Sequence, residues 1–282
     1  MKITTYRNIF REALFPLYDE KEIDSFFYLI LEENHELKRI DLALDPHKEL
    51  SHSELAQWDT ILASLKKEIP IQYILGSTFF YGLRFNVSPH VLIPRPETEE
   101  LVEWIISNYK ERQNLKILDI GTGSGCIAVS LAKNLESSEV SAIDVSAEAL
   151  EIASGNASAN AVNVNFIKTD ILSAEDLPQQ YDIIVSNPPY VRNLEKHEIQ
   201  NNVLLHEPHL ALFVEDDDAL LFYRNIAQLA RTNLKKGGSL YFEINQYLGK
   251  ETKSLLVQEG FSEVTLGKDI YGNDRMLKAT HT

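Results

Sequence analysis

The chain of 282 residues is almost without cysteine, since Cys126 is the only one. A single cysteine excludes an internal disulfide framework and is typical of a reducing compartment, so we expect a cytoplasmic protein. Long apolar runs are missing too. The longest, Phe26–Leu31, is far too short to cross a bilayer, and the first seven residues lack the apolar segment of a signal peptide. We therefore expect no membrane partner.

Positive charge is also scarce. With 27 basic and 42 acidic residues the net charge is −15, and the Lys/Arg pairs are isolated rather than gathered in a block. A protein that grips DNA or RNA without specificity normally presents a basic surface. The composition therefore argues against a stand-alone DNA-modifying enzyme, and we expect no direct nucleic-acid partner.

Three regions follow one another along the chain. Residues 1–75 carry apolar side chains at helical spacing, which predicts a small helical domain. Residues 76–96 are punctuated by glycine and proline around two short strand-like runs, which predicts a hairpin linker. Residues 97–282 form the third region, in which strand and helix patterns alternate from residue 115 on.

The alternating region predicts an α/β fold with a mostly parallel seven-stranded sheet and helices on both faces. Ligands of such sheets bind beyond the carboxyl ends of the strands. The predicted strands span residues 116–120, 140–143, 164–167, 182–186, 239–244, 262–266 and 276–279, and the predicted helices span 126–135, 146–160, 217–235 and 249–259.

A glycine-rich turn follows the first predicted strand of the sheet. Glycine lets the main chain approach a ligand closely, and the free N–H groups of the next helix suit an anion. Asp144 ends the next strand, about twenty residues past the turn, where an acid accepts hydrogen bonds from ribose hydroxyls. The turn consists of Gly121, Thr122, Gly123, Ser124 and Gly125.

Two classes of cofactor share these features. The spacing here is Gly-x-Gly-x-Gly rather than the Gly-x-Gly-x-x-Gly of dinucleotide enzymes, and Asp119 stands two residues before the first glycine. A carboxylate at that point suits an ammonium or sulfonium cation better than a pyrophosphate. We therefore favour S-adenosylmethionine over a nicotinamide cofactor. A plain turn that packs helix on strand is the structural alternative.

Two residues near the turn have more than one interpretation. Asp170 follows the third predicted strand, where it can accept a hydrogen bond from an adenine amino group or serve only as a helix N-cap or loop aspartate. Cys126 stands at a helix start, where the pKa of a thiol can fall, but it has no evident partner base, so we interpret it as a small packed residue. We expect no metal site.

The second motif is the tetrapeptide Asn187-Pro188-Pro189-Tyr190, which follows the predicted strand 182–186. The Asn187 side-chain oxygen and the Pro188 carbonyl can each accept one hydrogen of a planar amide or amino group. Proline adds no competing N–H, and Tyr190 can stack on the flat acceptor. Aligning nitrogen and methyl can contribute on the order of 7–11 kcal/mol through orientation. The motif predicts methyl transfer to a planar nitrogen, with a rigid turn as the alternative.

No catalytic base is assigned, because the proton can leave after the nitrogen has attacked. The nearby candidates are interpreted as surface or loop residues; they are His197, His206, His209 and Glu207.

The chain resembles the release factor glutamine methyltransferase family over nearly its whole length. The resemblance rests on the glycine turn, on the tetrapeptide and, most specifically, on Ile93-Pro94-Arg95-Pro96-Glu97-Thr98-Glu99. Further similar segments are Pro70–Gly76, Ala142–Ser146, Glu207–Leu212 and Tyr271–Arg275.

The resemblance implies a Rossmann-like class I S-adenosylmethionine-dependent methyltransferase with a small helical amino-terminal domain. The acceptor would be the side-chain amide of the glutamine in the Gly-Gly-Gln motif of peptide chain release factors, which the helical domain would help to dock. Asn187 and Pro188 would hold the amide, Tyr190 would pack on it, and the glycine turn, Asp144 and Asn187 would line the cofactor. We expect a monomer that acts in translation termination.

The chain departs from the family pattern at three points. Ile171 replaces an aromatic residue that commonly follows the acid at position 170, and the runs 243–248 and 214–218 lack usual glycines. Two other functions remain open. An adenine-specific DNA or RNA methyltransferase would need a basic recognition region, which the composition does not show. A non-catalytic cofactor-binding module predicts damage to one of the motifs, and both are intact.

Overall fold

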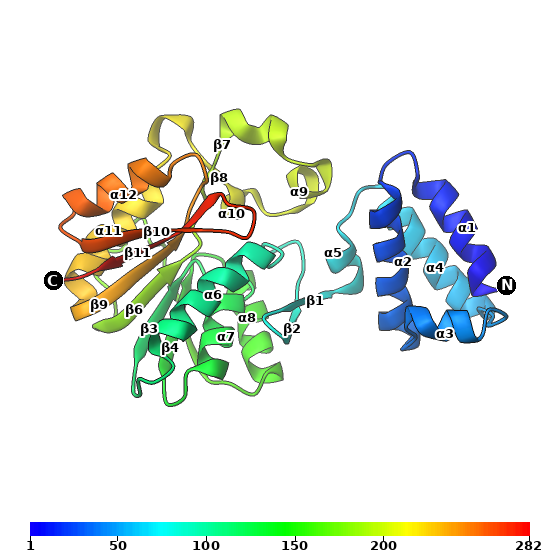
Figure 1. Cartoon of the computed structure of the whole chain (residues 1–282), viewed down its shortest axis with the longest axis horizontal. Helices are drawn as coiled ribbons and strands as arrows, with labels where there is room; N and C mark the ends of the chain where they lie inside the picture. The colour runs from blue at the N-terminus through cyan, green and yellow to red at the C-terminus, as the bar shows by residue number, and fades with distance from the viewer. The chain divides into compact units, whose positions relative to one another are not determined.

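The computed structural model describes all residues, 1–282, which form two compact units (Figure 1). The first unit comprises Met1–Gly76 together with Asn201–His206, and the second comprises Ser77–Gln200 together with Glu207–Thr282. The expected division differs in two respects, because the structure includes the hairpin in the second unit and a short helix from residues 201–206 in the first. No helix combines the length and apolarity that crossing a bilayer requires.

The first unit is helical, as expected. Trp58 forms the centre of its core, where its ring contacts Phe27 and Tyr6 at centroid distances of 4.9 and 5.5 Å. Ser51 begins the helix that carries Trp58, because its hydroxyl accepts the Glu54 N–H while Glu54 accepts the Ser51 N–H in a capping box. The helices are α1 (Ile3–Leu14), α2 (Glu20–His35), α3 (Arg39–Leu44), α4 (His52–Leu65), α5 (Ile71–Leu75) and α9 (Asn201–His206).

The second unit contains the predicted mostly parallel sheet, which is confirmed with seven strands in the order β10-β11-β9-β6-β3-β4-β5. The five strands from β9 to β5 are parallel, and β11 is antiparallel to both of its neighbours. The strands are β3 (Lys116–Ile120), β4 (Glu139–Asp144), β5 (Val164–Lys168), β6 (Tyr181–Ser186), β9 (Leu234–Glu243), β10 (Ser262–Lys268) and β11 (Asp274–Thr280).

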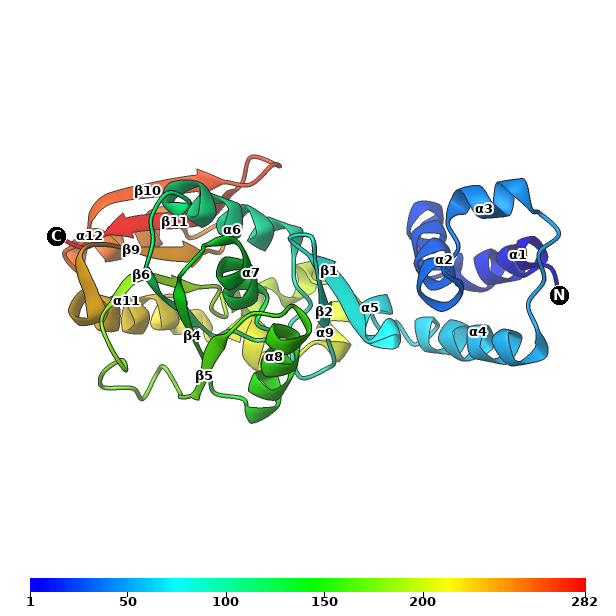
Figure 2. The same ribbon diagram turned by 90° about the horizontal axis from the view of Figure 1, so that it is seen from below.

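Helices cover both faces of this sheet (Figure 2). Successive residues of a strand point to opposite faces, so Ile117 packs in one apolar cluster and Leu118 in the other. The first cluster includes side chains of α6 (Pro96–Tyr109), α7 (Cys126–Asn134) and α8 (Ala147–Ala159). The second includes side chains of α11 (Leu221–Asn233) and α12 (Gly249–Gln258).

The hairpin of β1 (Ser77–Phe80) and β2 (Leu83–Asn86) packs against the sheet domain. Asn156 of α8 holds it in place: its Oδ1 accepts the Asn86 N–H at 2.7 Å, and its Nδ2 donates to the Asn86 carbonyl at 3.0 Å. The segment 191–216, for which the sequence predicted no elements, contains β7 (Val191–Arg192), a 3₁₀ turn (Asn193–Glu198), α10 (His209–Leu212) and β8 (Phe213–Val214) in addition to α9. A second 3₁₀ turn, Asp216–Asp218, overlaps the start of the predicted helix 217–235.

Candidate functional site

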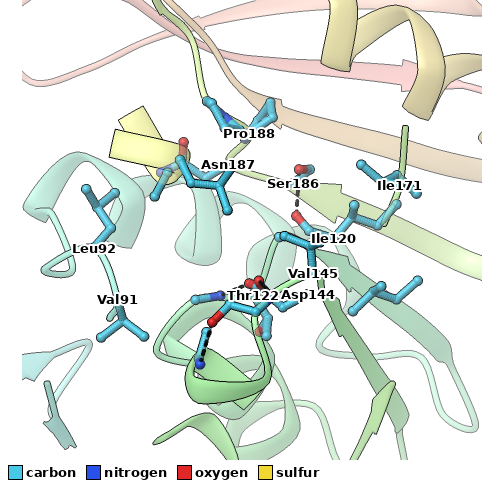
Figure 3. Close-up of a pocket in the computed structure, with 18 of the residues that line it drawn as sticks. Val91, Leu92, Ile120, Thr122, Asp144, Val145, Ile171, Ser186, Asn187 and Pro188 are labelled. Carbon is cyan, nitrogen blue, oxygen red and sulfur yellow. Dashed lines mark hydrogen bonds between the residues drawn. The ribbon is translucent and has the colours of Figure 1, made fainter. Parts of the chain in front are cut away.

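A cavity of about 280 Å³ lies at the carboxyl ends of β3, β4, β5 and β6 (Figure 3). The segments that follow these strands contribute most of its wall, and the segment 90–98 adds another side. The predicted residues that line the cavity are Gly121, Thr122, Gly123, Ser124, Asp144, Asp170, Asn187, Pro188 and Pro189, whereas Gly125 and Tyr190 do not line it.

The glycine turn between β3 and α7 uses its glycines for two purposes. Gly121 and Gly123 have φ angles of 73° and 53°, and a Cβ at either would meet no protein atom within 4 Å. The space beside them is therefore open to a ligand. Gly125 has φ 81°, and a Cβ there would come within 3.0 Å of the Ala153 Cβ. This glycine permits close packing of α7 on α8.

Asp119 lies behind the turn and is fully buried. Its Oδ2 accepts hydrogen bonds from Thr122 Oγ1 (2.6 Å) and the Ala128 N–H (3.3 Å), whereas Oδ1 has no partner. Burial raises the pKa of this carboxyl to about 7, although the two hydrogen bonds oppose the shift. Because Asp119 does not line the cavity, its carboxyl braces the turn from behind rather than facing the cavity, where the sequence suggested that it would meet a cation.

Asp144 connects the end of β4 to the turn. Its Oδ2 accepts the Gly123 N–H at 2.8 Å, and its Oδ1 accepts the Ser146 N–H at 3.0 Å (Figure 3). These bonds fix the carboxylate at the cavity wall. Each carboxylate oxygen can accept a second hydrogen bond, so the group can still receive the two hydroxyls of a ribose.

The cavity wall around Asp170 is aliphatic. Asp170 Oδ1 accepts the Leu172 N–H at 3.0 Å and thereby stabilises a turn after β5, while the residue itself lines the cavity. Val145, Ile171 and Leu172 also line it. Aliphatic side chains therefore replace the aromatic ring that is common in the family at position 171, and they offer apolar contacts to a flat base.

Cys126 begins α7 beside the turn. Burial, with a smaller contribution from the nearby Asp119 carboxyl, raises the pKa of its thiol to about 12. A thiol with a raised pKa is a poor nucleophile. The thiol is therefore not an activated nucleophile, and Cys126, half-buried, contributes to the cavity wall.

At the Asn-Pro-Pro-Tyr turn, Asn187 and Pro188 face the cavity across from Thr122 and Asp144 (Figure 3). Asn187 Nδ2 donates to Thr98 Oγ1 at 3.4 Å, and no hydrogen bond within the chain engages its Oδ1. Tyr190 is half-buried, and its hydroxyl donates to Glu243 Oε1 at 3.0 Å. Burial and the negative charge of Glu243 raise the pKa of Tyr190. Its stacking on an acceptor stays a prediction.

The sequence reasoning gave no role at this site to four residues, Thr98, Glu243, Arg95 and Glu207. Thr98 lines the cavity, Glu243 ends β9 in the core beneath it, and Glu207 accepts hydrogen bonds from Arg95 Nη2 (2.6 Å) and the Ile93 N–H (3.2 Å). Glu207 lies in a loop as expected, but its side chain is buried rather than on the surface. The signal was present for Thr98, Arg95 and Glu207, because all three belong to segments that resemble the family.

The open turn, the Asp144 carboxylate and the aliphatic wall fit S-adenosylmethionine, whose amino-acid, ribose and adenine parts need such partners. A mostly parallel sheet with this site at its carboxyl edge defines a Rossmann-like methyltransferase. Consistent with this, the family described as "Methyltransferase small domain" matches residues 98–215, and "PrmC N-terminal domain" matches residues 9–76.

The chain belongs to the release factor glutamine methyltransferase family. It is 63% identical over 281 residues to the release factor glutamine methyltransferase of Flavobacterium psychrophilum, with 99% of each chain covered. It is 44% identical over 279 residues to that of Bacteroides thetaiotaomicron, again with 99% of each covered. A 16S rRNA methyltransferase of Thermus thermophilus, solved with AdoMet and guanosine, shares the fold with a TM-score of 0.54 at 21% identity; the match covers 73% of this chain and 50% of that one.

Proposed function

We propose that this protein transfers a methyl group from S-adenosylmethionine to the side-chain amide nitrogen of the glutamine in the Gly-Gly-Gln motif of peptide chain release factors. The observation that carries the proposal is that the glycine turn and the Asn187 turn open on one cavity in a chain of this family. One motif suits the methyl donor and the other suits a planar nitrogen.

The donor side of the cavity binds and orients the cofactor. S-adenosylmethionine supplies an electrophilic methyl group. Asp144 accepts hydrogen bonds from the ribose hydroxyls, and Asp170 accepts one from the adenine amino group. Val145 and Ile171 exclude water from the base, because both line the cavity with apolar atoms.

The acceptor side holds the glutamine amide. Asn187 Oδ1 and the Pro188 carbonyl each accept one hydrogen of the amide NH₂ group. Both hydrogens would then be fixed, and with them the orientation of the amide nitrogen in the cavity; orientation of this kind can contribute on the order of 7–11 kcal/mol. Pro188 and Pro189 keep the loop free of competing N–H donors. We propose that the Tyr190 ring, which supports the turn from behind the cavity wall, packs on the amide plane when the acceptor is bound. The methylated nitrogen would lose its proton to water after transfer, so no side chain need act as a base.

The partner proposals rest on surface and charge. We propose that the helical unit Met1–Gly76 helps to dock the release factor, since Phe15, Ile40 and Leu44 expose 72%, 60% and 78% of their surface there. The net charge of −15 supports a protein acceptor without direct nucleic-acid contact. The enzyme would act as a monomer in the cytoplasm during translation termination.

Mass spectrometry of unmethylated release factor after incubation with the protein and isotopically labelled cofactor tests the proposal. We expect one labelled methyl group on the Gly-Gly-Gln glutamine and none on a matched release factor that carries Gly-Gly-Ala. DNA incubated in parallel should stay unlabelled. Label on adenine, with none on the release factor, would favour the adenine methyltransferase instead.

A further inference from the structure

Glu243 is a buried acid next to the turn Asn187–Tyr190. Both oxygens of its side chain accept hydrogen bonds from residues at this turn or beside it. It ends β9, next to β6, where the register pairs Phe242 with Ser186 and so brings Glu243 beside Asn187. Only 1% of Glu243 is exposed. Its Oε2 accepts a hydrogen bond from Thr98 Oγ1 at 2.6 Å, and its Oε1 accepts one from Tyr190 at 3.0 Å.

The hydrogen bond from Thr98 to Glu243 determines which group of the Asn187 amide can face Thr98. A hydroxyl has one hydrogen, and Thr98 donates its hydrogen to the Glu243 carboxylate. Toward Asn187 the same hydroxyl can therefore only accept, so the Asn187 group that faces it must be the NH₂. The Asn187 carbonyl oxygen is the atom left for the acceptor. An amide that flipped would present two donors to a substrate group that itself donates.

The surroundings support an acid that accepts from both hydroxyls. Burial raises the pKa of Glu243 and the nearby Glu97 carboxylate adds to this, whereas the hydrogen bonds from Thr98 and Tyr190 and the charge of Arg275 oppose the shift. Tyr223 donates to the Glu243 main-chain carbonyl at 3.2 Å, which fixes the backbone of the residue. The pKa is raised on balance, so the role of Glu243 as an acceptor rests on the geometry, in which one hydroxyl contacts each carboxyl oxygen.

We propose that Glu243 is a positioning residue for the acceptor: through Thr98 it sets the polarity of the Asn187 amide so that Oδ1 faces the glutamine, and through Tyr190 it anchors the other end of the turn. The proposal rests on the proposed function and deepens it. It gives a purpose to Thr98, which lies in the segment Ile93–Glu99 far from the Asn-Pro-Pro-Tyr motif in sequence but adjacent to it in the fold.

Thr98→Val is the main test, because valine keeps the shape and removes the hydroxyl. We expect kcat for methylation to fall about tenfold or more. The calorimetric Kd for S-adenosylmethionine should stay within roughly twofold, because the residues that hold the cofactor are unchanged. Thr98→Ser restores the hydroxyl and should restore most of kcat. A defect of packing alone would instead be as large in the serine variant, which lacks the methyl group.

A double-mutant cycle tests the route through Glu243. If Thr98 acts on Asn187 only through its hydrogen bond to Glu243, the effects of the two substitutions should not add. The double variant Thr98→Val/Glu243→Gln should then have a kcat no more than about twofold below that of Glu243→Gln alone. If the two substitutions instead lowered kcat by independent factors that multiply, the relay from Glu243 through Thr98 to Asn187 would be overturned.

NMR of the Asn187 side-chain amide separates this inference from the proposed function. The Asn187 Nδ2 resonances, assigned by their loss in Asn187→Ala, should shift in Thr98→Val and stay near the wild-type position in Thr98→Ser. Failure of the wild-type protein to methylate release factor would refute the proposed function, while the resonances would still report on the relay. Unchanged resonances in Thr98→Val would refute the relay whatever the acceptor proves to be.

Discussion

Arg95 and Glu207 form an ion pair with 2.6 Å between Arg95 Nη2 and Glu207 Oε1. The Glu207 carboxylate is almost fully buried, and its second oxygen accepts the Ile93 N–H. This pair ties the segment that leads into α6 to the loop before α10. It therefore holds two walls of the cavity together, since Arg95 and Pro208 both line it.

Arg95→Ala is expected to destabilise the sheet domain. The change leaves Glu207 buried without its cation, and we expect a loss of about 2–3 kcal/mol in the free energy of unfolding. Urea denaturation followed by circular dichroism measures it. Arg231→Ala is the matched control, because Arg231 is exposed on α11 and makes no hydrogen bond or ion pair; it should change stability by less than about 0.5 kcal/mol. Equal effects of the two variants would contradict the role of the pair.

Gly125→Ala and Gly155→Ala are expected to act in opposite directions. Alanine at position 125 must adopt φ 81° and bring its Cβ within 3.0 Å of Ala153. We expect a loss of about 2–4 kcal/mol in stability and weaker cofactor binding. Gly155 lies inside α8, where a Cβ meets nothing within 4 Å, so alanine should stabilise by roughly 0.5–1 kcal/mol. Thermal unfolding and calorimetry of both variants check this, and a stable Gly125→Ala protein with normal affinity would count against the packing argument.

Asp144→Ala is expected to weaken S-adenosylmethionine binding by about 1.5–3 kcal/mol, because it removes a charged acceptor for the ribose hydroxyls. The loss of the bond from Gly123 adds to the effect, since the turn is then free to move. Asp170→Ala keeps the ribose acceptor and should lose less. Isothermal titration calorimetry compares the two, and an unchanged affinity in Asp144→Ala would rule out its assignment.

Asp119 is expected to make stability depend on pH. Burial raises the pKa of its carboxyl from 3.8 to about 7 in the folded protein, so the folded state holds the proton more tightly than the unfolded state. The stability that this proton contributes is complete below pH 4 and is lost as the pH rises to about 7. The loss is on the order of 4 kcal/mol. Asp119→Asn cannot titrate, so its stability relative to wild type should increase between pH 4 and pH 7.

Urea denaturation at pH 5 and pH 8 without cofactor measures this difference. Glu136→Gln is the control, because Glu136 is exposed and has no partner. Asp182→Asn would not serve, because Asp182 forms an ion pair with Lys235. A difference between wild type and Asp119→Asn that did not change with pH would show that Asp119 keeps an ordinary pKa.

Local sequence patterns predicted the seven strands and the helices between them, because a strand or helix pattern depends on residues that are close together in the sequence. β3 and β6 are buried apolar runs, and the motifs that follow them must meet at the same edge of a parallel sheet. The cavity between the Gly121 turn and Asn187 was therefore predictable without coordinates. The hairpin 77–86 was also recognisable, although its attachment to α8 through Asn156 was not.

The contacts that could not be predicted join residues far apart in sequence. Thr98 and Glu243 are 145 positions apart, and Arg95 and Glu207 are 112 apart. Nothing in the local pattern distinguishes Glu207 from a surface acid, because its burial depends on which loop covers it. The direction of the Asp119 side chain was unpredictable for the same reason. Its position before the turn suggested a ligand contact, but in the fold its carboxyl points inward to Thr122.

Asn187→Ala is expected to remove methyl transfer and leave the fold intact. The side chain contributes one acceptor to the glutamine amide, and losing such an oriented partner should lower kcat by roughly a hundredfold or more. The cost in stability should be small, less than about 1 kcal/mol, because the only hydrogen bond lost is the long one to Thr98. Labelled-methyl assays on purified release factor and thermal unfolding measure the two effects.

Asn193→Ala, in the segment that follows the motif, is the matched control. It removes hydrogen bonds to Val214 and Glu215 but no cavity residue, so it should keep its activity. Full turnover by Asn187→Ala would refute the role of its amide, and equal losses in both variants would point to the loop as a whole.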